Sequence, residues 1–242
     1  MNINNLVYDT AWLNREGIAS LACGNGEKAH ACFKNVLEVM GYITQFSDLP
    51  VGDTASAASS AIASVTPVSI PRFQKEGFYI YHSALLFQPQ PAASNPTFTQ
   101  IDITLLSAAA IFNMALTYHQ RAVQGRGSPG NLLRIAARMY DQCLQIVHSL
   151  PLAAAAAATV EKDVGALLLI VLNNRAHIYY EMGDFDNATQ MLQRVRKLSR
   201  SMSREDAASD GASLLLVLHD DAFEEIALNV LVTCPPATAP CA

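Results

Sequence analysis

Apolar and small residues recur at steps of three and four along most of this chain, which places them on one face of an α-helix. The clearest example is the stretch 168–199, where two such patterns lie on either side of Gly183 and Asp184. Glycine commonly ends a helix, and aspartate commonly caps the start of the next one. The pattern therefore predicts a helical hairpin over residues 168–199.

The same periodicity predicts three helix pairs within a single, mainly α domain of 242 residues. Short turns join the helices of the first and third pairs, and a longer turn around 125–130 joins those of the second, which predicts antiparallel helical hairpins. A long insertion separates the first two pairs, and a C-terminal cap follows the third. The predicted helix pairs cover about residues 5–46, 105–150 and 164–200, the insertion covers 47–104, and the cap covers 211–242.

The insertion changes character along its length. Residues 47–77 are rich in serine, alanine and proline, which is typical of a long loop, with a weak helical turn at 55–63. Residues 78–87 are rich in aromatic and aliphatic side chains, and residues 97–104 alternate apolar and polar positions. These two stretches predict either a short β-hairpin or a strand that packs against the helices.

The helix pairs resemble the tetratricopeptide repeat (TPR), a helix–turn–helix unit with small residues where its two helices approach. The resemblance implies a right-handed solenoid of three divergent units whose first helices line a concave groove. FNMALTYH and LNNRAHIYYEMG are also loosely similar to stretches of TPR-like proteins of diatom algae, which implies no activity. The matching positions include Gly17, Ala29 and Phe33 in the first pair, Ala115, Tyr118, Ala136 and Tyr140 in the second, and Ala176, Tyr179, Gly183, Ala188 and Leu192 in the third.

By this alignment, several polar side chains face the groove and are candidates for binding a partner. An asparagine side chain both donates and accepts hydrogen bonds, so it can bind the backbone of an extended peptide. An alternative is that the Asn173–Asn174 pair bonds neighbouring loops, including the insertion, which could fill the groove. The groove candidates are Asn14, Asn113, His119, Asn173, Asn174, His177, Tyr180 and Glu181.

Composition excludes several classes of protein. A net charge of −5 without a basic stripe argues against nucleic-acid binding. The apolar runs are shorter than a membrane span needs, and the N-terminus lacks the pattern of a signal peptide. Five widely spaced cysteines indicate no disulfide framework and favour a reducing, intracellular, cytoplasmic location.

No motif indicates catalysis, a cofactor or a metal site. His119 and His177 lack carboxylates at ligand spacing, so structural roles are favoured for both. The sequence thus predicts a non-enzymatic scaffold or adaptor that binds a protein or peptide, or pairs with itself. Two alternatives are a small-molecule binder or enzyme with a pocket between the helices and residues 78–104, and a structural subunit whose residues 223–242 dock on a neighbour.

Overall fold

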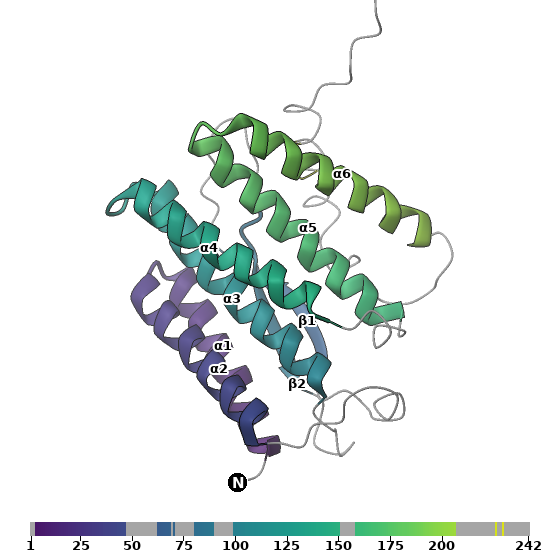
Figure 1. Ribbon diagram of the computed structural model, residues 1–242. Coiled ribbons are helices and arrows are strands. Elements are labelled where there is room, and N and C mark those ends of the chain that lie inside the picture. Colours follow the sequence, from purple (N-terminus) through teal and green to yellow (C-terminus); the bar gives the residue numbers. More distant parts are fainter. Residues whose placement is uncertain are drawn as a thin grey trace, which may run out of the picture. The chain divides into compact units, whose positions relative to one another are not determined.

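A computed structural model describes residues 3–46, 62–68, 70, 80–89, 99–150, 158–206, 226 and 229 (Figure 1). The protein is mainly α-helical, as predicted, with one small antiparallel sheet. The chain forms two compact units. The first comprises Met1–Arg72 and His82–Glu161, and the second comprises Phe73–Tyr81 and Lys162–Ala242.

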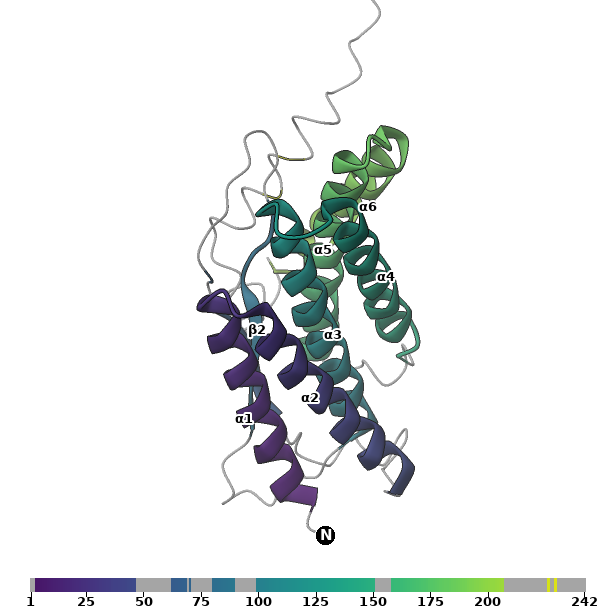
Figure 2. The same ribbon diagram turned by 90° about the vertical axis from the view of Figure 1, so that its left-hand side faces the viewer.

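The first unit contains two helical hairpins. Helix α1 (Ile3–Ala22) packs against α2 (Gly26–Phe46), α2 packs against α3 (Gln100–Val123), and α3 packs against α4 (Pro129–His148) (Figures 1 and 2). The predicted pairs over 5–46 and 105–150 are therefore confirmed as helices. Fully buried side chains between these helices include Phe33, Val36, Phe112, Leu116 and Tyr140.

The close approach of α1 to α2 depends on Gly17. A Cβ atom at this position would lie 2.5 Å from Cε1 of Phe33, a side chain that is itself fully buried. Only glycine therefore leaves room for the Phe33 ring between the two helices. The turn after α1 is also made by a glycine, because Gly24 has a φ of 74°. Gly17 and Phe33, both at positions that match the repeat pattern, thus lie against each other.

The start of α3 corrects one prediction. Residues 97–104 were expected to form a strand, but α3 begins at Gln100 and its N-cap is Thr99. The Thr99 Oγ1 accepts from the Asp102 backbone N–H at 3.2 Å, and the Asp102 carboxylate accepts from the Thr99 backbone N–H at 2.9 Å. This reciprocal pair is a capping box. It satisfies two donors at the helix start, and this outweighs the alternating pattern.

The sheet consists of β1 (Ile62–Val68) and β2 (Ala84–Pro89), paired antiparallel with Val65 opposite Phe87. The prediction of a strand in residues 78–87 is thus partly right. The predicted partner, 97–104, is wrong, and so is the prediction of a loop at 62–68. Of the helical turn suggested at 55–63, residues 55–61 lie outside the described residues and 62–63 belong to β1 instead. Strand β2 packs against α1 and α3, the first helices of the two hairpins (Figure 2).

The second unit contains one helical hairpin, α5 (Ala158–Glu181) and α6 (Phe185–Asp206), which run side by side in Figures 1 and 2. Gly183 has a φ of 76° and ends α5, as predicted. Asp184 accepts a hydrogen bond from the Asn187 backbone N–H at 3.3 Å, which is the predicted cap of α6. The predicted cap at 211–242 lies outside the described residues except at Ile226 and Asn229, which are both buried.

Helix α3 is unusually apolar. Among the described helices it is the one that is long and apolar enough to cross a membrane, with a mean hydropathy of 1.5 over its most apolar window. Within the protein, 67% of that window is buried. Because α3 packs against α2, α4 and β2, its position in the core of the first unit accounts for this composition.

Candidate functional site

Two asparagines on the first helices of the two hairpins bind the backbone of Leu85 in β2. Asn113 on α3 accepts a hydrogen bond from the Leu85 N–H at 2.8 Å and donates one to the Leu85 carbonyl at 2.9 Å. Asn14 on α1 donates to the same carbonyl at 2.9 Å, and it accepts from Asn113 Nδ2 at 3.1 Å. All three residues are buried. We call Asn14 and Asn113 the Leu85 clamp.

The clamp takes the place of a third strand beside β2. Leu85 lies opposite Pro67 of β1, and both backbone polar groups of Leu85 are directed at the helices. In an antiparallel ladder such a residue forms a pair that exchanges no hydrogen bonds with its partner strand. Pro67 has no backbone N–H. At a position of this kind the N–H points away from the partner strand, so its absence costs the β1–β2 pair no hydrogen bond. At Leu85, side-chain amides therefore satisfy the edge of β2 that faces away from β1.

The second unit repeats this chemistry at Tyr81. Asn174 on α5 accepts from the Tyr81 backbone N–H at 2.8 Å and donates to the Tyr81 carbonyl at 2.8 Å. Its neighbour Asn173 donates to Asn174 at 3.3 Å and accepts from Asn229 Nδ2 at 2.8 Å. Asn173, Asn174, Tyr81 and Asn229 are all buried. We call Asn174 the Tyr81 clamp.

Asn113 and Asn174 occupy the same place in their hairpins. Each precedes a fully buried alanine by two residues, Ala115 in α3 and Ala176 in α5. Each binds the N–H and the carbonyl of one residue in the segment 80–89. Equivalent positions of the two helices thus perform the same task, which is what a structural repeat would produce.

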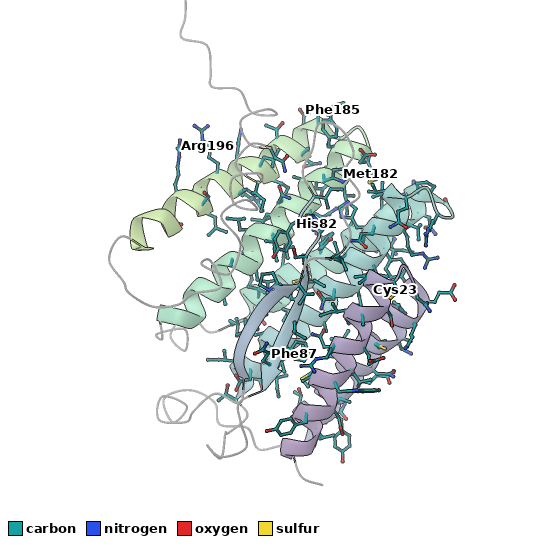
Figure 3. The ribbon with its side chains drawn as sticks, turned by 180° about the vertical axis from the view of Figure 1, so that it is seen from behind. Cys23, His82, Phe87, Met182, Phe185 and Arg196 are labelled. Atoms are coloured by element: carbon teal, nitrogen blue, oxygen red, sulfur yellow. The ribbon has the colours of Figure 1, made fainter. Side chains whose placement is uncertain are left out.

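The remaining groove candidates divide into buried and exposed positions. In the first unit, His119 is fully buried with its Nδ1 3.4 Å from the hydroxyl oxygen of Tyr140. In the second unit, His177 Nε2 lies 3.6 Å from a carboxylate oxygen of Glu181, one helical turn along α5. Tyr180 is 41% exposed and its ring packs edge-on against Phe185, near the α5–α6 turn marked by Met182 and Phe185 in Figure 3.

The hydrogen bonds of the two clamps go to backbone groups. Within the described ranges, no group of three or more histidine, cysteine or acidic side chains could hold a metal ion. Cys143 is fully buried and donates to the Ala108 carbonyl at 3.4 Å, and burial raises the pKa of its thiol to about 12. A thiol with such a pKa remains protonated at neutral pH and is a poor nucleophile.

Sequence reasoning found the asparagines but did not identify the residues that they bind. It left open whether the insertion fills the groove where these asparagines lie. In the structure, the residue bound at each clamp does belong to the insertion, in the segment 80–89. Leu85 and Tyr81 contribute backbone groups, which every residue except proline carries. The one available signal was the apolar composition of residues 80–87, which is unusual for an exposed loop. In the structure Tyr81, Ala84, Leu85 and Phe87 of this stretch are buried, and Figure 3 labels Phe87 on β2.

Comparison with known proteins finds no match to a family model, to a curated protein or to a solved structure. The fold itself defines the class of this protein, which is a mainly α protein built of helical hairpins with a small sheet.

Proposed function

We propose that this protein is a non-enzymatic scaffold or adaptor that binds an extended protein segment on the first helices of its hairpins. The observation that carries the proposal is the double hydrogen bond between the Asn113 side chain and the Leu85 backbone. An amide that donates and accepts in one plane can bind any extended residue that has an N–H. The recurrence of this bond at Asn174 supports a surface adapted to extended chains.

The proposal takes the three hairpins as successive units of a right-handed, TPR-like solenoid. Small-angle X-ray scattering of the purified chain would test that arrangement, because a solenoid has a more extended scattering profile than a collapsed bundle of equal mass.

Cross-linking of the purified full chain in an extract of its source cells, with light scattering of the chain alone, tests the function itself. The proposal predicts a partner whose cross-linking saturates, or a defined homo-oligomer. A strictly monomeric chain with no saturable partner would refute it. Asn113→Ala is the informative variant, because equal retention of a partner by this variant places the binding surface away from the Leu85 clamp. Asn35→Ala, an exposed change on α2, is the matched control.

A further inference from the structure

The Leu85 clamp binds a strand of its own chain by groups that carry no sequence information. Its bonds go to one N–H and one carbonyl, which are common to all residues except proline. The clamp itself would therefore accept another extended chain as well as β2. Selectivity must come from the side chains that β2 buries beside it.

From this geometry we propose that β2 is an internal ligand, and that an external extended peptide of the pattern small–Leu–x–Phe competes with it for the Leu85 clamp. The inference rests on the proposed function and specifies the partner of that surface. While β2 is bound the clamp is occupied, so β2 also acts as an autoinhibitory segment.

The required pattern follows from burial along β2. Ala84 is fully buried, so a larger side chain at this position has no room. Leu85 and Phe87 are 1% and 3% exposed and point to one face of the strand, because side chains alternate along it. Leu86 is half-buried and Gln88 is exposed, so these positions tolerate substitution.

Release of β2 separates it from one described neighbouring strand, β1. In the described part of the chain the sheet has two strands, so β2 pairs with β1 alone and is otherwise held by its packing on α1 and α3. The edge of β2 away from β1 depends at Leu85 on side-chain amides rather than on a third strand. Because β2 is tethered to the helices, its effective concentration is on the order of millimolar, so an external peptide binds weakly until β2 is displaced.

The test is the binding of a labelled peptide with the sequence of residues 80–89, measured by fluorescence anisotropy with the full chain. Ala84→Glu should weaken β2 in the protein, because it places an unpaired carboxylate at a fully buried position. Gln88→Glu is the matched control, since it adds the same charge to the same strand at an exposed position. A variant that raises the open fraction tenfold should tighten the apparent Kd about tenfold.

Two further changes separate binding at the clamp from nonspecific association. In the first, the peptide is N-methylated at the residue equivalent to Leu85, which removes the N–H that donates a hydrogen bond to Asn113. In the second, Asn113→Ala is added to Ala84→Glu, which removes the clamp's main side chain from the protein. Each should weaken peptide binding to Ala84→Glu by about tenfold or more, the value of a lost hydrogen bond that leaves a buried group unpaired. Equal binding of the methylated peptide would overturn the proposal.

The remaining outcomes are also decisive. If Ala84→Glu keeps its helical circular dichroism and binds no peptide, β2 is a fixed part of the core and the proposal fails, while the scaffold function stands if a partner still cross-links. If Ala84→Glu does not fold, hydrogen exchange of the Leu85 amide in the wild-type chain replaces it. Excess peptide should then accelerate that exchange, and an unchanged rate refutes the proposal.

Discussion

Asn113 should contribute more to stability than Asn14, although both bind the same carbonyl. Asn113→Ala leaves the buried N–H of Leu85 without its acceptor at 2.8 Å, and a buried donor without a partner costs about 1–3 kcal/mol. Asn14 also loses the Nδ2 donor that it accepts from at 3.1 Å, which adds about 1 kcal/mol. The Leu85 carbonyl still accepts from Asn14. We therefore expect Asn113→Ala to lower the free energy of unfolding by about 2–4 kcal/mol.

Asn14→Ala leaves both hydrogen bonds between Asn113 and Leu85 in place. The Leu85 carbonyl loses one of two donors and stays satisfied, but one N–H of the Asn113 amide loses its acceptor, so the expected cost is about 1–3 kcal/mol. This cost remains about 1 kcal/mol below that of Asn113→Ala, which also leaves the Asn14 acceptor unpaired. Asn35→Ala, on the exposed face of α2, should change stability by less than about 0.5 kcal/mol.

Urea unfolding followed by far-ultraviolet circular dichroism measures these differences, and hydrogen exchange at the Leu85 amide reports on the clamp directly. The order of effects is Asn113 first, Asn14 second and Asn35 last. If Asn14→Ala costs as much as Asn113→Ala, the Leu85 N–H does not need its side-chain acceptor, and the reasoning is wrong.

Three further outcomes concern the same unit. Asn113→Asp keeps an acceptor for Leu85 but buries a carboxylate beside the oxygen atoms of Leu85 and Asn14, so the folded-state pKa of that carboxyl lies above its unfolded value of about 4. The stability of this variant relative to wild type should therefore fall as pH rises above about 4, and a pH-independent difference would contradict this. Gly17→Ala should cost about 1–3 kcal/mol by overpacking Phe33, whereas the same substitution elsewhere in a helix, at Gly41, meets nothing within 4 Å and should stabilise by about 0.5–1 kcal/mol; equal urea midpoints would refute the close contact. In the native protein a maleimide should modify exposed Cys23 quickly and buried Cys143 only on unfolding, as peptide mapping would show.

The helices were predictable because their signals are local. Periodic apolar positions, the turn glycine at Gly183 and the cap at Asp184 lie within a few residues of the structure that they specify. Gly17 and Phe33 were both expected at packing positions, but their contact with each other was not predicted. The helix ends were less predictable. Helix α5 begins at Ala158 rather than at 164, and α6 ends at Asp206 rather than at 200. At the start of α3, Thr99 and Asp102 form a cap inside an alternating stretch.

The sheet was not predictable because the groups that stabilise it are distant in sequence. Strand β1 contains serine, threonine and Pro67, a composition typical of a loop, and it is a strand because β2 pairs with it. Leu85 of β2 is bound by asparagines from α1 and α3, which are 71 and 28 residues away in the sequence. No local pattern records such a contact, so the asparagines could be nominated as binding residues while their ligand could not.

Pro67 also bears on how this protein behaves at high concentration. A third strand added beside β1 would need an N–H donor at the position opposite Leu85, and proline supplies none. Edge strands that offer a continuous row of donors and acceptors are templates for stacking between copies, and a proline at the edge interrupts that row. The residue that makes β1 look like a loop in the sequence is therefore also one that hinders β1 from seeding aggregates.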